Sequence, residues 1–468
     1  MKIRFLFSLL LLSFSGFAQV SLPALVSNNM VLQQKADVNI WGWANPGERV
    51  TVTGSWDNNA VSTFTNENGV WKLSIKTPAA GGPYSVAVEG SNKIVLQNIL
   101  IGEVWLCAGQ SNMEWSADLG VKDARAELPT AYNANIRFFD MAKHGTNAPQ
   151  TDCKGTWTVC DSLTLKRFSA VGYFFGKKLN QSLQVPIGLI DVAWGGSYIE
   201  SWIPQELVNL FADTRASAQG MIPSKGWPNQ AGYIYNGMIA PTLNYNIAGA
   251  IWYQGESNRH YPSVYYQLSH LMVETWRGLW KKELPFYYVQ IAPFNYGDNT
   301  QFKAAAVREM QTRAQDLPKS GMVVVSDLVD NLSDIHPAYK KEVGNRLAGW
   351  ALAETYNQKT SPYKSPQYRE LKVNGNIASI YFNYAEGGLV AKGGEPTEFE
   401  IAGADRVFYK AQAIIKADLV EVLSEKVNNP VAVRFSFRDA PVPNLFSKEG
   451  LPVVPFRTDN WELEAKTK

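Results

Sequence analysis

Short runs of alternating hydrophobic and polar residues fill the first part of the chain. Residues 38–41 (V-N-I-W) and 71–75 (W-K-L-S-I) place every second side chain on the same side, as strands with one buried face do. Turn sequences such as N-P-G at 45–47 and G-G-P at 81–83 separate the runs. Strands at this spacing predict a small β-sandwich over residues 19–98.

The pattern changes at residue 99, where continuous apolar runs begin to alternate with helical periodicities. Val343, Leu347, Trp350 and Ala351 follow the i, i+4, i+7, i+8 spacing of one helix face. Such alternation predicts an α/β domain over residues 99–360, with a parallel sheet covered by helices on both faces. The expected buried strands span 187–192, 248–253, 286–291 and 322–325, and two further expected helices span 265–279 and 302–315.

Alternating strands return after residue 361. Residues 377–382 (I-A-S-I-Y-F) and 431–437 (V-A-V-R-F-S-F) again show the period of two, and glycine pairs at 387–388 and 393–394 mark turns. We therefore expect a second β-rich region over residues 361–468. We expect it to pack against the first.

The N-terminus has the features of a targeting segment. Lys2 and Arg4 precede an apolar run over residues 5–14 that is too short to span a bilayer, and G-F-A follows at 16–18. This order predicts a signal peptide over residues 1–18 and an exported protein, either periplasmic or secreted. No later segment is long and apolar enough for a membrane anchor, so we expect none.

Composition narrows the class of function. Hydrophobic residues make up 46% of the 468 positions and charged residues 18%, which predicts a packed globular protein. A net charge of +2 gives no reason to expect nucleic acid as a partner. Three cysteines and four histidines lack metal-ligand spacing, so we expect no metal and no cofactor. Cys153 and Cys160 could close a short loop as a disulfide, whereas Cys107 is expected to be a buried thiol.

Candidate chemistry begins with C-A-G-Q-S-N-M-E-W at residues 107–115. The motif follows an apolar run and contains Ser111 in a small-residue turn with Gly109, an arrangement by which many hydrolases expose a nucleophile. Three other stretches also follow expected strands, namely G-G at 195–196, Q-G-E-S-N at 254–258 and D-I-H-P at 334–337. Ligands bind at the carboxyl ends of parallel strands, so these stretches are expected to form one site.

An ester hydrolase needs a base beside its serine and donors for the oxyanion. Among the four histidines, His336 is the best base, because Pro337 places it in an extended loop before a helix. The expected oxyanion donors are the Ser111 N–H, the Gly196 N–H and the Asn258 amide. His260 lies close to the Asn258 loop and is a candidate for substrate contact.

These four stretches, taken in order, closely resemble the sialate O-acetylesterases of the SGNH hydrolase superfamily. The resemblance runs from about residue 20 to the C-terminus. It implies a three-layer α/β/α, flavodoxin-like hydrolase domain with accessory β-sandwich regions on its N- and C-terminal sides. It also implies removal of O-acetyl groups from sialic acids without a metal. Position by position, Ser111 matches the nucleophile, Gly196 and Asn258 the oxyanion residues, and His336 the base.

The acid that orients the base departs from the superfamily pattern. Its usual position, three residues before the histidine, holds Ser333 in this chain. Asp334 is our first candidate, because residues two apart in an extended loop point the same way. Glu256 is the alternative acid, and a main-chain carbonyl with a Ser–His dyad is the third possibility.

Substrate contacts and competing functions complete the prediction. Sialic acid carries a carboxylate, so cationic and amide side chains near the site are candidates for binding it. A second enzymatic function is deacetylation of xylan or another polysaccharide, and a non-enzymatic one is carbohydrate binding by an inactive relative. The oligomeric state is not predicted. The candidate substrate contacts are Gln110, Gln254, Arg259 and Lys340, with Trp115, Trp194 and Tyr253 as pocket walls.

Overall fold

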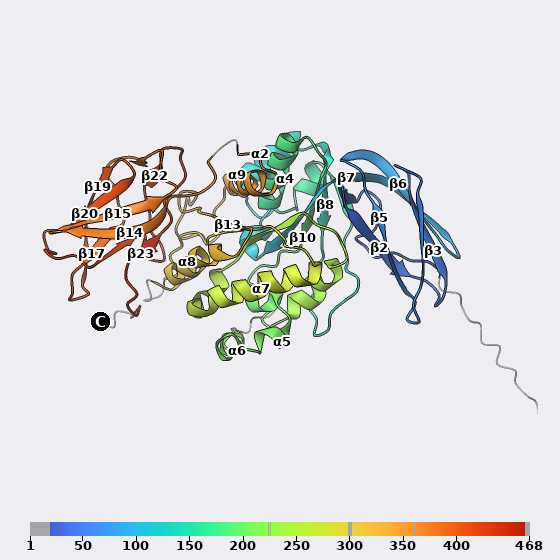
Figure 1. Cartoon of the computed structure of the whole chain (residues 1–468), viewed down its shortest axis with the longest axis horizontal. Coiled ribbons are helices and arrows are strands. Elements are labelled where there is room, and N and C mark those ends of the chain that lie inside the picture. Colours follow the sequence, from blue (N-terminus) through green and yellow to red (C-terminus); the bar gives the residue numbers. More distant parts are fainter. Residues whose placement is uncertain (1–18, 223, 225, 298–301, 360–361, 464–468) are drawn as a thin grey trace, which may run out of the picture.

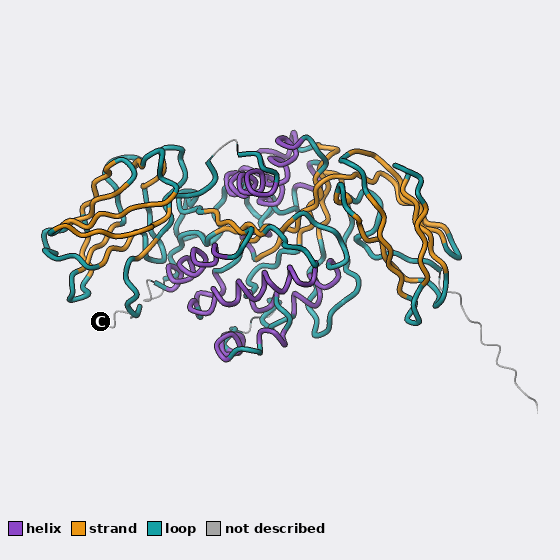
Figure 2. The backbone as a smooth tube through the Cα atoms, in the orientation of Figure 1, coloured by secondary structure: helices purple, strands orange, loops and turns teal. Residues whose placement is uncertain are grey.

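The computed structural model describes residues 19–222, 224, 226–297, 302–359 and 362–463. These residues form three units in a row, with β structure at both ends of a mixed α/β unit (Figure 1). Figure 2 shows the helices gathered in the middle unit. The predicted signal peptide, residues 1–18, lies outside the described residues.

The expectation that the second β region packs against the first is wrong. The two regions lie at opposite ends of the molecule (Figure 1). The physical reason is that the C-terminal strands bury their apolar residues in a core of their own, which includes Ile380, Val420 and Phe435. The N-terminal strands instead share one continuous core with the middle unit.

The N-terminal unit is built mostly from antiparallel strand pairs, and its first strand pairs in parallel with its last. In the strand β5 (Val70–Lys76) every second residue is buried, as its alternating sequence V-W-K-L-S-I-K predicts. The last strand is long, because it continues from this unit into the central sheet, so the expected boundary at residue 98 falls inside it. The strands are β1 (Val31–Gln33), β2 (Asp37–Trp43), β3 (Arg49–Gly54), β4 (Ala60–Phe64), the alternating β5 (Val70–Lys76), β6 (Gly81–Glu89) and the long β7 (Lys93–Gly109).

The middle unit holds a central, mostly parallel sheet. Its order is β13-β12-β11-β7-β10-β8-β9, and only β9 runs antiparallel to its neighbour. Strands β10 and β11 are buried at every position, which is why their sequences are apolar without alternation. The remaining strands of this sheet are β8 (Asn133–Asp140), β9 (Trp157–Cys160), β10 (Ile187–Asp191), β11 (Gly249–Tyr253), β12 (Phe286–Val289) and β13 (Ser320–Val323).

Helices pack against both faces of this sheet. Successive strand residues point to opposite faces, so Trp252 joins a core with α7 and α8 while Tyr253 joins a core with α4 and α9. The α-helices are α1 (Ser111–Glu114), α2 (Lys122–Glu127), α3 (Ser162–Leu165), α4 (Ala170–Leu183), α5 (Gln205–Val208), α6 (Ala212–Gln219), α7 (Tyr265–Trp280), α8 (Lys303–Arg313) and α9 (Lys341–Trp350).

Short 3₁₀ and π segments join these helices and strands. They are η1 (Leu128–Thr130), η2 (Ile199–Trp202), η3 (Tyr235–Ile239), η4 (Ala240–Thr242), η5 (Glu256–His260), η6 (Pro262–Val264), η7 (Ala314–Asp316) and η8 (Ala351–Thr355).

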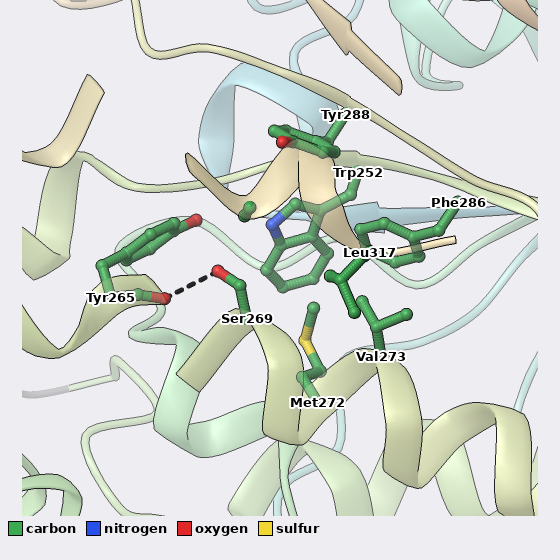
Figure 3. A pocket seen from close by; sticks show the side chains of 9 residues that line it. Trp252, Tyr265, Ser269, Met272, Val273, Phe286, Tyr288 and Leu317 are labelled. Atoms are coloured by element: carbon green, nitrogen blue, oxygen red, sulfur yellow. Dashed lines mark hydrogen bonds between the residues drawn. The ribbon is translucent and has the colours of Figure 1, made fainter. Parts of the chain in front are cut away.

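Helix α7 packs on β11 and β12 around the Trp252 indole. Figure 3 shows Met272 and Val273 of α7 facing this ring, with Phe286 beside it. The hollow between them measures about 10 Å³ and is lined almost entirely by apolar atoms. A space of this size holds no more than a single water, so it is a packing gap and not a substrate site.

The C-terminal unit is all β in the part that the structure describes. Arg457 forms a two-pronged ion pair with Glu309 of α8, at 2.8 and 2.9 Å, which attaches this unit to the middle one. Its strands are β14 (Gln367–Asn374), β15 (Ile377–Asn383), β16 (Leu389–Ala391), β17 (Phe399–Ala402), β18 (Phe408–Lys410), β19 (Gln412–Lys416), β20 (Leu419–Leu423), β21 (Ala432–Phe435), β22 (Leu445–Ser447) and β23 (Phe456–Arg457).

Candidate active site

Ser111 stands on a sharp turn between β7 and α1, at the carboxyl end of the central strand. Gly109 has a φ of +140°, and a Cβ at this position would lie 2.2 Å from the Tyr253 carbonyl oxygen. Only glycine lets β7 approach β11 this closely while turning into the helix. The turn therefore presents Ser111 at the edge of the sheet where the flanking strands also end.

His336 meets Ser111 from the loop between β13 and α9. The His336 Nε2 atom lies 2.8 Å from the Ser111 Oγ atom, a hydrogen-bond distance. Trp115 stacks on the imidazole with ring centroids 4.0 Å apart and nearly parallel planes. Burial, followed by the charge of Lys340, lowers the pKa of His336 to about 4. The imidazole is therefore neutral at pH 7 and able to accept a proton.

Asp334 and Glu256, the two candidate acids, take different places. One Asp334 carboxylate oxygen accepts a hydrogen bond from the His336 backbone N–H at 2.9 Å and lies 3.8 Å from the His336 Nδ1 atom. Glu256 instead accepts a 2.6 Å hydrogen bond from the Asn112 amide. Within the described ranges, no hydrogen bond joins Glu256 to His336. Of the two carboxylates, Asp334 is the one that contacts His336 in this structure.

The glycine pair after β10 lies against the nucleophile. A Cβ on Gly195 would be 3.4 Å from the Ser111 Cβ, and the Gly195 N–H donates to Glu114 at 2.7 Å. Gly196 has a φ of +70°, which favours glycine. In the part of the chain that the structure describes, the Gly196 N–H donates no hydrogen bond. That donor suits an oxyanion.

Asn258 lies in a buried hydrogen-bond network. Its Oδ1 atom accepts from the Ile199 N–H at 3.0 Å and from Gln254 at 2.7 Å, and its Nδ2 atom donates to Glu200 at 2.8 Å. This network fixes the orientation of the amide and leaves one Nδ2 hydrogen for another acceptor. Burial raises the pKa of Glu200, whose other oxygen accepts from Ser217.

Two of the expected substrate contacts are occupied inside the protein. Gln254 donates both amide hydrogens, to Ser197 and Asn258, so none remains for a substrate. Lys340 is fully buried and donates to Asn112 at 2.6 Å. The expectation that Lys340 binds a substrate carboxylate is therefore corrected, because the ammonium lies beneath the site and not on its surface.

The other expected contacts differ in their exposure. Gln110 is buried and accepts from the Gly255 N–H at 3.3 Å. Arg259 is half-buried over the Tyr296 ring, at 4.1 Å, and Trp194 is half-buried, whereas His260 is exposed. Tyr253 is buried beneath Lys340, so it belongs to the core and does not form a pocket wall.

Four residues of the site were not predicted. Asn112 and Glu114 follow Ser111 in the N-M-E motif, and Glu200 lies in the stretch after the glycine pair, yet no spacing rule indicates which partners they meet. Trp227 was also missed, because it lies in a loop remote from every motif. It is 56% exposed, and a Cβ on Gly196 would lie 2.5 Å from its ring.

The cysteines carry no disulfide among the described residues. Cys107, Cys153 and Cys160 are all free thiols. Burial raises the pKa of both Cys153 and Cys160 to about 12, and the Cys160 thiol donates to the Ala131 carbonyl. The disulfide that we considered for Cys153 and Cys160 is therefore not formed in this structure.

A metal-binding cluster and a membrane-spanning helix are both absent from the described ranges. No group of three or more His, Cys, Asp or Glu side chains there is placed to hold a metal ion. No helix in those ranges has the length and apolar character needed to cross a membrane.

Known proteins resemble this chain along most of its length. Residues 101–356 match a family described as "Carbohydrate esterase, sialic acid-specific acetylesterase". Human sialate O-acetylesterase is 30% identical over 398 residues, covering 77% of this chain and 75% of that protein. The mouse enzyme is 27% identical over 420 residues, covering 77% and 78%. A carbohydrate acetylesterase from Xanthomonas citri has a crystal structure with 35% identity and a TM-score of 0.87, covering 94% of this chain and all of that one.

Proposed function

This chain belongs to the carbohydrate esterase family of sialic acid-specific acetylesterases, and we propose that it removes O-acetyl groups from sialic acids with Ser111 as nucleophile and His336 as base. The observation that carries the mechanism is the 2.8 Å contact between the Ser111 hydroxyl and a neutral imidazole. The substrate rests on the family and on relatives named as sialate O-acetylesterases.

The positions of these groups support the following reaction. His336 takes the Ser111 proton as Oγ attacks the acetyl carbonyl carbon, and the oxyanion is held by the N–H groups of Ser111 and Gly196 and by the Asn258 amide. The imidazolium then protonates the sugar oxygen as its bond to the acetyl carbon breaks, which releases the sugar with a free hydroxyl and leaves an acetyl-serine. Water attacks this ester with His336 as base, and acetate departs as Ser111 regains its proton. Asp334 stabilises the imidazolium in both steps.

We assign the middle unit to the three-layer α/β/α SGNH architecture. Two features support this assignment: the parallel sheet with β7 at its centre, and the separate cores on its two faces. Export is proposed from the sequence of residues 1–18 alone.

Acetate release tests the proposal. We expect the wild-type protein to release acetate from O-acetylated sialic acid, and the Ser111→Ala variant to lose at least about 1000-fold in kcat, because the attacking oxygen is gone. Circular dichroism of both proteins controls for folding. Release from acetyl-xylan but not from sialic acid would keep the mechanism and change the substrate. Acetyl-xylan is tested because the similar Xanthomonas citri protein is described as a carbohydrate acetylesterase. Glycan binding without release from either would contradict an esterase.

A further inference from the structure

Asn112, the residue after the nucleophile, is bonded at every polar atom of its side chain. Its Oδ1 atom accepts from the Lys340 ammonium at 2.6 Å. Its Nδ2 atom donates to the Glu256 carboxylate at 2.6 Å and to the Ile335 carbonyl at 3.1 Å. A cation on the oxygen and two acceptors on the nitrogen permit only one orientation of the amide.

This one amide connects the three segments that carry the proposed chemistry. Asn112 belongs to α1 with Ser111, and Glu256 begins η5 after β11. Ile335 immediately precedes His336, and Lys340 precedes α9. The loop that carries the base is therefore held to the helix that carries the nucleophile by hydrogen bonds beneath both.

The network contains two buried groups of opposite charge, Glu256 and Lys340. Burial raises the pKa of Glu256 and lowers that of Lys340 to about 8, while each charge favours the ionised form of the other. Asp123, Asp334 and Asp330 add weaker attraction for Lys340. Around His336, Lys340 opposes protonation, whereas Asp334 and Glu114 favour it. Removing Lys340 therefore favours the imidazolium.

We propose that Asn112, Lys340 and Glu256 are positioning residues that hold His336 against Ser111, and that Asn112 fixes the Lys340 cation beneath the loop that carries the base. This inference rests on the proposed esterase function. It assigns the network two effects, one on the geometry of the Ser111–His336 pair and one on the electrostatics of the imidazole. A merely structural role would produce neither a change in the pH profile nor a selective loss of kcat.

Lys340→Met tests the inference, with Lys341→Met as the matched control, because Lys341 is the exposed neighbour. We expect kcat to fall by about 100-fold with KM little changed, since a misplaced base slows chemistry and not binding. We also expect the acid limb of kcat/KM to move to higher pH by roughly one unit in Lys340→Met alone. An unmoved acid limb in a folded Lys340→Met protein would overturn the electrostatic effect.

A second measurement keeps the inference separate from the proposed function. The titration of the His336 imidazole, followed by NMR and assigned with His336→Gln, reports the same pKa whether or not any ester is cleaved. Should Lys340→Met fail to fold, Asn112→Asp places a second carboxylate 2.6 Å from Glu256 and is expected to lose kcat similarly. Wild-type kcat in a folded Asn112→Asp protein would overturn the positioning effect.

A separate observation concerns the exposed ring beside the site. Trp227 lies against Gly196 and is anchored by its neighbour Pro228, whose carbonyl accepts from the Ser201 hydroxyl at 2.6 Å. An exposed indole held beside the oxyanion glycine offers an apolar face to a sugar ring. We infer that Trp227 stacks on the sugar that carries the acetyl group and so selects glycan esters.

Trp227→Ala tests this role, with Trp227→Phe as the conservative control. The loss of stacking is expected to raise KM for O-acetylated sialic acid by roughly fivefold in Trp227→Ala, with partial rescue in Trp227→Phe. Hydrolysis of ethyl acetate, which has no ring, should be unchanged. An equal loss on both esters would show that Trp227 only supports Gly196 and would overturn the inference.

Discussion

The Asp334 carboxylate lies where water reaches it, with its side chain 47% exposed. It touches the base twice, through the backbone N–H and at 3.8 Å through Nδ1. An exposed acid is screened by solvent, so its stabilisation of the imidazolium is weaker than that of a buried one. Its main effects are to fix the His336 loop and to favour the protonated ring.

Asp334→Asn separates these two effects, because the amide oxygen still accepts from the His336 N–H while the charge is lost. The carboxylate raises the pKa of His336, so its removal lowers that pKa and moves the acid limb of kcat/KM to lower pH. This shift is opposite to the one expected for Lys340→Met. We expect kcat to fall by roughly tenfold. Full activity with an unmoved acid limb would favour a Ser–His dyad with a main-chain carbonyl as orienter.

Residue types could be assigned to chemistry from the sequence, but their partners could not. Ser111 and His336 are predicted because a nucleophile and a base each follow a strand, and the structure brings them together. Lys340 follows the histidine closely, and nothing in its sequence position indicates that it is buried. The contact of its ammonium with Asn112 depends on how α9 packs, which is a tertiary property.

The helices and strands with the clearest sequence patterns were predicted with the most accurate bounds. The expected helix over 265–279 is α7 (Tyr265–Trp280), and the expected strand over 187–192 is β10 (Ile187–Asp191). Both are long or continuously apolar, so their patterns leave little ambiguity.

Helix α4 was missed because glycines interrupt its sequence. A Cβ on Gly176 would lie 2.6 Å from the Leu189 side chain, and one on Gly172 would lie 3.0 Å from the Cys107 sulfur. These glycines let the helix approach β10 and β7 closely, although glycine in a helix interior usually indicates a break. Strand β8 was missed because a charged residue interrupts its apolar run. That residue, Arg137, is nevertheless buried within the strand.

At the scale of the whole molecule, the C-terminal unit is fastened to the helix that supports the oxyanion loop. Asp439 accepts from the Ala304 N–H at the start of α8 at 2.8 Å, and its charge attracts the buried Arg308. Further along α8, Gln311 donates to the Gln254 carbonyl at 3.0 Å. The attachment of the distal β unit is thus linked to the loop that carries Asn258.

Asp439→Ala is expected to weaken this attachment. The substitution removes the cap of α8 and leaves the Arg308 cation buried without its carboxylate, which together cost about 3 kcal/mol. We expect the melting temperature, followed by calorimetry, to fall by several degrees, and kcat at 25 °C to change less than in Lys340→Met, because no group of the base is touched. Asp405→Ala, at an exposed turn of the same unit, is the matched control. Equal melting temperatures for the two variants would show that the β unit is held by its other contacts, such as the Arg457–Glu309 pair, and not by this cap.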